Sequence, residues 1–173
     1  MNILDTPRLC LRTIEADDAP FYLALINDPS WIRNIGDKGI RTLQAARAAI
    51  VEGPCAMQQR LGFSLYLIVR RSDQAPLGLC GLIKRDALPD VDIGYAIAPP
   101  YWGQGYAYEA AQAVMAYAHD ALGLQRLLGI TAPENIGSNR LLRKLGLHFD
   151  KFIHLVPGDK GSNLYSHDFS IPA

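Results

Sequence analysis

The chain has 173 residues, of which 49% are hydrophobic and 20% charged, with 17 lysine and arginine residues against 17 aspartate and glutamate residues. This length is typical of one domain, and the composition excludes disordered, collagen-like and coiled-coil chains. The zero net charge argues against nucleic-acid binding, which relies on many lysine and arginine contacts to phosphate.

The N-terminal third predicts one strand and two helices. Alternating polar and apolar side chains indicate the strand, and an Asp-Asp-Ala-Pro sequence suits the first turn of a helix. The second helix is expected to have Thr42 as its N-cap and to break or kink at Gly53-Pro54, because proline removes a helical hydrogen bond. The polar residues 28–39 predict an irregular loop on the substrate side. The expected elements are a strand over 8–12 and helices over 17–26 and 42–59.

The middle of the chain predicts strands, and helices alternate with strands after it. Two apolar runs joined by a short polar connection indicate a hairpin, and a third run ends at Pro99-Pro100, which cannot continue a ladder. Small residues at three- and four-residue spacing predict a closely packed helix that ends at Gly123. Asn135 is expected to cap the next helix. The expected strands are 63–70, 76–84, 91–98, 127–131, 149–156 and 163–171, and the expected helices are 107–122 and 135–146.

This order of elements indicates a single α/β (α+β) domain over residues 1–173, with a mixed, mostly antiparallel sheet of about seven strands and about four helices. No window approaches the ~18 consecutive apolar residues of a membrane span, and the first residues lack a signal-peptide pattern. Cys10, Cys55 and Cys80 are widely spaced and form no CxxC pair, which favours reduced thiols. We therefore expect a cytoplasmic protein without a membrane partner.

The segment Gly103-Gln104-Gly105-Tyr106-Ala107 lies between a predicted strand and a predicted helix. Glycines let a backbone approach a ligand, and the N–H groups that open a helix attract anions such as phosphate. A dinucleotide fingerprint would need a third glycine where Tyr108 stands, and a Walker loop would need Gly-Lys-Ser/Thr, which is absent. A turn that only requires positive φ is the alternative at this point.

Four segments in a fixed order carry a family resemblance. Trp102 to Ala107 is similar to a Gln/Arg-x-x-Gly-x-Gly/Ala pyrophosphate loop except at its first position, with Ile93-Gly94-Tyr95 before it and Glu109-Ala110 after it. These residues resemble the GNAT superfamily of N-acetyltransferases, in the branch that contains the ribosomal-protein N-terminal acetyltransferases. The other three segments extend the resemblance over nearly the whole chain: Leu4 to Arg12, Asn135 to Leu147, and Leu164 to Ser166.

The resemblance implies a sheet with splayed central strands and acetyl-CoA (coenzyme A) as the cofactor. The loop amides would hold the pyrophosphate, while the backbone of residues 96–98 would pair with the pantetheine arm. A helix further along the chain would complete the site. The implied cofactor-binding residues are Ala96, Ile97, Ala98, Trp102, Gly103, Gln104, Gly105, Tyr106, Ala107, Asn135, Ser138, Arg140 and Lys144.

Acetyl transfer needs a neutral amine, a stabilised oxyanion and a protonated leaving thiolate. Many family members place a tyrosine acid where this chain has Leu142, and the resemblance implies Ser138 as the catalytic substitute. A helix-cap role is the alternative for Ser138. No general base stands out in the sequence. Asp90 and Asp92 lie on the strand beside the acceptor and Glu109 on the loop helix, and Asp92 is the candidate taken forward. The alternatives are a turn role for Asp90, a solvent-facing Asp92 and helix stabilisation by Glu109, and an amine that loses its proton to a water chain needs no base. Trp31 is a candidate for lining the acceptor pocket, with core packing as its alternative.

No histidine or cysteine spacing indicates a metal site, and no nucleophilic dyad indicates an acyl-enzyme. We therefore expect an acetyl-CoA-dependent N-acetyltransferase that transfers acetyl directly to a primary amine, with a protein or peptide N-terminal α-amine as the first choice of acceptor. A small-molecule amine and a catalytically idle acyl-CoA-binding module are the alternatives. The expected oligomeric state is a monomer or a homodimer: the resemblance makes a homodimer common among relatives, and nothing in the chain requires one.

Overall fold

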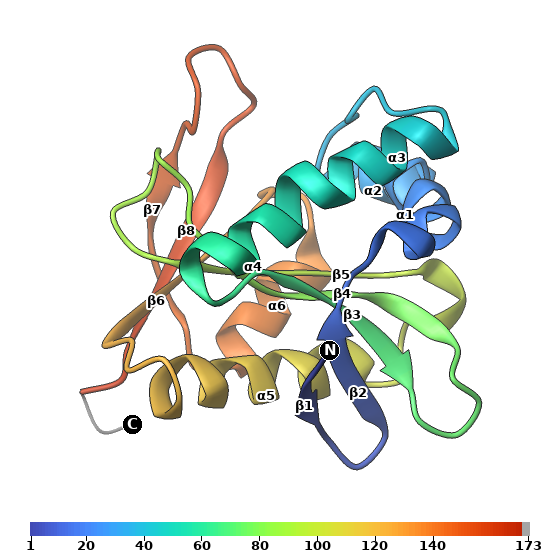
Figure 1. Ribbon diagram of the computed structural model, residues 1–173. Helices are drawn as coiled ribbons and strands as arrows, with labels where there is room; N and C mark the ends of the chain where they lie inside the picture. Colours follow the sequence, from blue (N-terminus) through green and yellow to red (C-terminus); the bar gives the residue numbers. More distant parts are fainter. Residues whose placement is uncertain (171–173) are drawn as a thin grey trace.

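The computed structural model describes residues 1–170 and is built on one eight-stranded sheet with the order β1-β2-β3-β4-β5-β6-β8-β7 (Figure 1). Neighbouring strands are antiparallel except for β5 and β6, which run parallel. The predicted mixed, mostly antiparallel sheet is therefore confirmed, with one strand more than expected. The strands are β1 (Asn2–Asp5), β2 (Leu9–Thr13), β3 (Leu65–Arg70), β4 (Pro76–Ile83), β5 (Asp92–Ile97), β6 (Arg126–Thr131), β7 (His148–Ile153) and β8 (Ser162–Asp168).

Helices cover both faces of the sheet (Figure 1). The Thr42 side chain caps α3 by accepting from the Ala45 N–H at 3.1 Å, as predicted. Pro54 lies inside a π-helical turn over Val51–Cys55, which joins α3 and α4 into one continuous helix. The wider turn accommodates the missing proline N–H at the position where the sequence predicted a kink. The α-helices are α1 (Ala19–Ile26), α2 (Pro29–Asn34), α3 (Leu43–Ile50), α4 (Ala56–Leu61), α5 (Tyr106–Asp120) and α6 (Ile136–Lys144).

Three local predictions need correction. Strand β1 was not expected, and it forms a hairpin with β2 at the edge of the sheet. Residues 28–39 are not irregular throughout, because Asp28 accepts from the Ser30 N–H at 2.8 Å and caps α2. The Asp-Pro pair at the start of α2 is a helix-opening signal that the polar composition of the segment masked. The last predicted strand ends in the structure at Asp168, and its predicted final residue, Ile171, lies outside the described residues.

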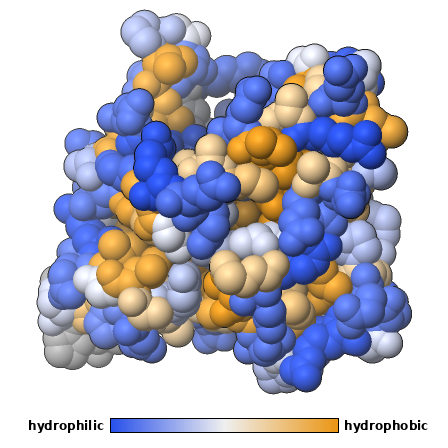
Figure 2. All heavy atoms as spheres, in the orientation of Figure 1, coloured by the Kyte–Doolittle hydropathy of each residue, from blue (hydrophilic) through white to orange (hydrophobic). Residues whose placement is uncertain are grey.

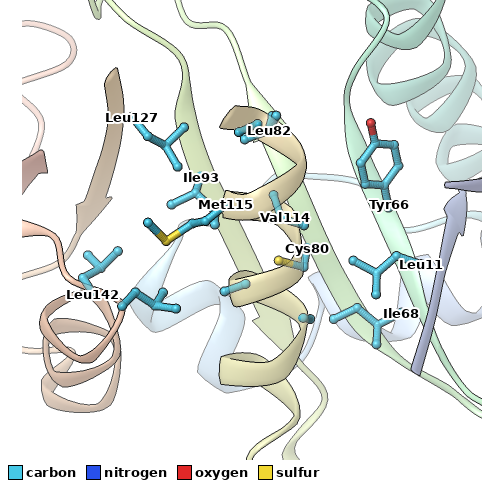
Figure 3. Close-up of a cluster of buried hydrophobic side chains, with 14 of the residues drawn as sticks. Leu11, Tyr66, Ile68, Cys80, Leu82, Ile93, Val114, Met115, Leu127 and Leu142 are labelled. Atoms are coloured by element: carbon cyan, nitrogen blue, oxygen red, sulfur yellow. The ribbon is translucent and has the colours of Figure 1, made fainter. Parts of the chain in front are cut away.

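Helices α5 and α6 pack on one face of the sheet. Along α5, Ala110, Ala111, Val114 and Ala118 are fully buried, so the stripe of small residues lets this helix lie close to the strands, as predicted. Figure 3 shows Val114 and Met115 of α5 among Cys80, Leu82 and Ile93 of the sheet. This cluster fixes α5 across β4 and β5, which places the first turn of the helix beside the end of β5.

The opposite face of the sheet carries α1 to α4. A separate buried cluster joins these helices to β3, β4 and the second half of β5, and it includes Tyr22, Trp31, Ile50 and Leu67. A smaller cluster lies on β6 and β8. Figure 2 shows this side of the molecule hollowed between the long helix over α3 and α4 and the β7–β8 hairpin. None of the helices within residues 1–170 is long and apolar enough to cross a membrane.

The central strands β5 and β6 separate soon after they meet. Their parallel ladder contains only the pairs Asp92–Leu128 and Ile93–Gly129, although β5 continues to Ile97 and β6 to Thr131. The second half of β5 therefore has hydrogen-bonding groups that β6 does not use. This gap is the splay that the resemblance implied.

Candidate active site

The open edge of β5 is formed by its odd-numbered residues. Leu128 N donates to Val91 O at 2.9 Å, whereas Ala98 N donates to Leu77 O on β4 at 2.8 Å. Because strand residues alternate in the direction of their N–H and C=O groups, the backbone of Tyr95 and Ile97 points into the gap. Ala96 and Ala98 point toward β4 instead. Of residues 96–98, which were expected to meet the pantetheine arm, only Ile97 therefore points its backbone groups into the gap.

A glycine-containing loop lies at the end of this edge. Gly103 and Gly105 adopt left-handed conformations with φ of 71° and 81°, and α5 begins at the next residue, Tyr106. A side chain added at Gly103 would meet nothing within 4 Å, so the loop is open to a ligand. The exposed loop and the first N–H groups of α5 therefore fit a diphosphate. Only the backbone of Tyr106 is available for this contact, because its side chain is buried.

Trp102 fastens the loop to the strand. Its indole Nε1 donates to Ile97 O at 2.6 Å, while about half of the side chain remains exposed. The contact occupies one of the acceptors on the open edge of β5. Trp102 and Ile97, both expected at the cofactor site, are thereby brought together at the mouth of the gap.

Tyr95 and Ser138 meet across the gap. The Tyr95 hydroxyl lies 2.9 Å from Ser138 Oγ and also donates to Ser138 O at 3.2 Å. Asn135 caps α6 by accepting from the Ser138 N–H at 3.1 Å, as predicted. Because the cap uses the backbone of Ser138, its hydroxyl is free to face Tyr95. Burial raises the pKa of Tyr95 well above its ordinary value, against the opposing effect of the Ser138 hydrogen bond.

Asn139, which the sequence analysis missed, holds the start of α6 in place. This buried side chain donates to Ala132 O at 3.0 Å and to Asn135 O at 2.8 Å. Its Oδ1 accepts from Tyr165 OH at 2.7 Å and from Asn163 Nδ2 at 3.0 Å. The side chain therefore ties the loop before α6 to β8. An asparagine directly after Ser138 in a helix was the available signal, because a buried amide requires partners.

Asp92 lies on the opposite face of the sheet from Tyr95, since the two residues stand three apart on one strand. Its side chain is fully buried, so the alternative that it faces solvent is wrong. Arg85 Nε donates to Asp92 Oδ1 at 3.0 Å, while Oδ2 has no hydrogen-bond partner among the described residues. Burial raises the pKa of Asp92 to about 6 and outweighs the charge of Arg85, which lowers it.

Two other residues characterise this face. Trp31 is buried against the helices and the second half of β5, and its Nε1 has no partner among the described residues. Desolvation lowers the pKa of Lys38, and the charge of Arg85, which contacts Asp92, lowers it further. The packing predicted as the alternative for Trp31 is present. Its unpaired N–H is an additional feature of the same face.

The two basic residues expected at the cofactor site both lie on α6. Lys144 Nζ is 4.2 Å from the ring centroid of Tyr108, in the first turn of α5. Arg140 is exposed one turn earlier on α6. Leu142, at the position of the family's tyrosine, is buried in the core against Gly129. Within residues 1–170, no three histidine, cysteine, aspartate or glutamate side chains are grouped as metal ligands.

Comparisons with known proteins agree with this geometry. Residues 8–148 match the family model of the acetyltransferase (GNAT) domain. An uncharacterized N-acetyltransferase of Bacillus subtilis is 30% identical over 98% of this chain and 96% of its own length. An acetyltransferase of Agrobacterium tumefaciens superposes with a TM-score of 0.80 at 24% identity, covering 96% of this chain and 94% of that one. A ribosomal-protein alpha-N-acetyltransferase (RimL) solved with coenzyme A has a TM-score of 0.82 at 19% identity, over 97% and 98% of the two chains.

Proposed function

Since the chain belongs to the GNAT family and is an N-acetyltransferase, we propose that it transfers acetyl from acetyl-CoA directly to the α-amine of a protein or peptide N-terminus. The observation that carries this proposal is the gap between β5 and β6. A free strand edge, an anion-binding loop and a paired serine and tyrosine converge there, and a buried carboxylate lies on the opposite face of β5.

The cofactor side of the gap is formed by backbone groups. The edge of β5 at Tyr95 and Ile97 can pair with an extended arm that carries amides, and the loop over Trp102–Ala107 can hold a diphosphate. Arg140 and Lys144 add positive charge on the neighbouring helix. When bound, acetyl-CoA would supply the activated acetyl thioester, and coenzyme A thiolate would be its leaving group. A protein of zero net charge can therefore hold this polyanion mainly with N–H groups.

Ser138 is the proposed proton donor to the leaving sulfur. Its hydroxyl hydrogen-bonds Tyr95, a phenol that is protonated at neutral pH and whose pKa burial raises further. A protonated phenol can hold the serine rotamer and return a proton to its oxygen.

Asp92 is the proposed proton acceptor for the attacking amine. It lies on the face of α1 to α4, opposite to Ser138, so the amine and the leaving thiolate would use different sides of the gap. Its Oδ2 is buried without a partner in the described residues, and its pKa of about 6 matches the requirements of a base at neutral pH. The alternative is that the amine loses its proton directly to water, and the pH profile of activity distinguishes this from proton transfer to Asp92.

The acceptor is proposed from the charge and shape of that face. Arg85 contacts Asp92, and Lys38 lies close enough to Arg85 for their charges to interact, which favours an acceptor that carries a carboxylate or acidic side chains near its amine. An N-terminal peptide with acidic residues at its second and third positions meets this requirement. The ribosomal-protein enzyme with the same shape acts on an α-amine, which supports the same class.

A panel of acceptors tests the proposal. Release of free coenzyme A thiol is measured with acetyl-CoA and peptides that differ only in the charge of positions two and three, alongside small primary amines. We expect turnover with peptides and a preference for acidic ones of about tenfold. Turnover confined to small amines overturns the acceptor, and absence of acetyl-CoA binding in calorimetry overturns the whole proposal.

A further inference from the structure

Glu109 connects the first turn of α5 to the turn between β1 and β2. Its Oε1 accepts from Thr6 Oγ1 at 2.6 Å and from Arg8 N at 2.9 Å, and its Oε2 accepts from Arg8 Nε at 2.6 Å. About 100 residues of chain separate the partners. Although burial alone raises the pKa of Glu109, the hydrogen bonds from Thr6 and Arg8 outweigh it and hold the pKa below its ordinary value.

Arg8 extends this contact to the glycine loop. Its Nη1 donates to Gln104 O at 3.0 Å, and its guanidinium lies 4.5 Å from the centroid of the Tyr106 ring. A side chain added at Gly105 would meet Arg8 Nη2 at 3.4 Å. One arginine therefore contacts Glu109 and both residues that flank the left-handed Gly105. Arg8 contacts the loop backbone at the Gln104 carbonyl and leaves the N–H groups of the loop unoccupied.

We propose that Arg8 and Glu109 are positioning residues that hold the phosphate-binding loop in its binding conformation from the side away from the ligand. This inference rests on the proposed function, because it assigns the 103–106 loop to the diphosphate of coenzyme A. Neither side chain touches the ligand. Their effect reaches it through the Gln104 carbonyl and the first turn of α5.

The physical basis is preorganisation of a loop that has few other anchors. Residues 102–105 are exposed, and both glycines have a wide choice of backbone conformations. Without an anchor, binding has to order the loop, and this lowers affinity by the cost of that ordering. Two charge-assisted hydrogen bonds from an arginine that spans a carboxylate and a carbonyl remove much of that cost beforehand.

The sign of the effect separates positioning from simple electrostatics. Replacing Glu109 with glutamine removes a negative charge close to a proposed phosphate site, so electrostatics alone predicts tighter binding of coenzyme A. Loss of the anchor predicts weaker binding. Arg8→Lys keeps the positive charge but cannot span Glu109 and Gln104 O together, so electrostatics predicts no change and positioning again predicts weaker binding.

The chain offers a closely matched control. Arg12 on β2 makes two hydrogen bonds to Asp18, at 2.8 and 2.7 Å, and Asp18 also accepts from the Glu15 N–H at 2.8 Å. The Asp18 and Glu109 side chains are similarly exposed, at 15% and 17%. Asp18→Asn thus removes an equivalent carboxylate–arginine contact at the start of α1, where no cofactor is proposed.

The experiment measures the dissociation constant of coenzyme A by calorimetry and the KM values of both substrates for Glu109→Gln, Arg8→Lys and Asp18→Asn in the full chain. We expect both loop variants to weaken coenzyme A binding about tenfold and to raise KM for acetyl-CoA alike, with kcat and acceptor KM within about twofold of the unaltered protein. Asp18→Asn should lower the melting temperature by about as much as the two loop variants do, and it should leave the dissociation constant of coenzyme A unchanged.

Tighter or unchanged binding in Glu109→Gln overturns the proposal, as does equal weakening in Asp18→Asn. If Glu109→Gln does not fold, Arg8→Lys decides on its own. An unaltered protein that binds no coenzyme A would instead refute the proposed function, which distinguishes the two failures.

Discussion

The Tyr95 hydroxyl and the Ser138 hydroxyl lie 2.9 Å apart although 43 residues of chain separate them. One comes from the strand and the other from the start of α6, so their hydrogen bond spans the gap where β5 and β6 part. Leu142 stands at the helix position where the family resemblance expects a tyrosine, and the phenol that contacts this helix comes from the sheet instead.

Ser138→Ala should lower kcat about a hundredfold, and Tyr95→Phe about tenfold, because the first removes the proposed acid and the second only its partner. Stopped-flow release of the thiol measures both, with coenzyme A affinity determined separately. The affinity should change less than twofold in Ser138→Ala. An equal loss of affinity and turnover would make Ser138 a binding residue instead.

Asp92 predicts a pH dependence of activity. A base must be deprotonated, so kcat/KM should rise as the pH passes through about 6 and should level off above it. Asp92→Asn should remove this limb and lower the plateau about a hundredfold. A profile that Asp92→Asn leaves unchanged would indicate that the amine loses its proton to water.

The same carboxylate predicts a pH dependence of stability. Its pKa in the folded protein is raised from 3.8 to about 6, so it favours folding below about pH 4, and this contribution is lost as the pH rises through 6. The loss amounts to roughly 3 kcal/mol of unfolding free energy. Urea unfolding at pH 4 and pH 7.5 measures the free energies of unfolding of the unaltered protein and of Asp92→Asn. At pH 7.5 Asp92→Asn should be the more stable of the two, and at pH 4 the difference between them should be smaller.

Two glycines provide a matched test of the loop. Gly103 and Gly123 have φ of 71° and 67°, and a side chain at either would meet nothing within 4 Å. Replacement of either by alanine should cost about 1 kcal/mol of stability through the left-handed conformation. Only Gly103→Ala should weaken coenzyme A binding, by about fivefold in calorimetry. Equal coenzyme A affinities of Gly103→Ala and Gly123→Ala would argue that the loop does not hold the diphosphate.

Asn139→Ala should destabilise the protein by about 3 kcal/mol, because it leaves several buried polar groups without partners. Asn163→Ala removes one of those partners at a half-buried position and should cost about 1 kcal/mol. Urea unfolding measures both. Similar losses would mean that water replaces the amide of Asn139.

The sequence was most informative where local chemistry determines structure. The caps at Thr42 and Asn135, the proline end of β5 and the small-residue stripe of α5 all follow from short-range rules, and the structure agrees with them. The pairing of Tyr95 with Ser138 and the burial of Asp92 depend on how distant segments pack. Periodicity gave the face of each strand residue, but only the parallel pairing with β6 shows which backbone groups of β5 remain free.

The short parallel ladder also makes β5 and β6 a seam between two antiparallel units, one over β1 to β5 and one over β6 to β8. Neighbouring strands within each unit share longer antiparallel ladders, whereas the seam has two residue pairs and the side chains of α5 and α6 packed across it. Amide hydrogens next to the seam should therefore exchange with solvent sooner than those inside either unit. An extended ligand lying in the gap would act as a missing strand, and its arrival should slow that exchange on both sides.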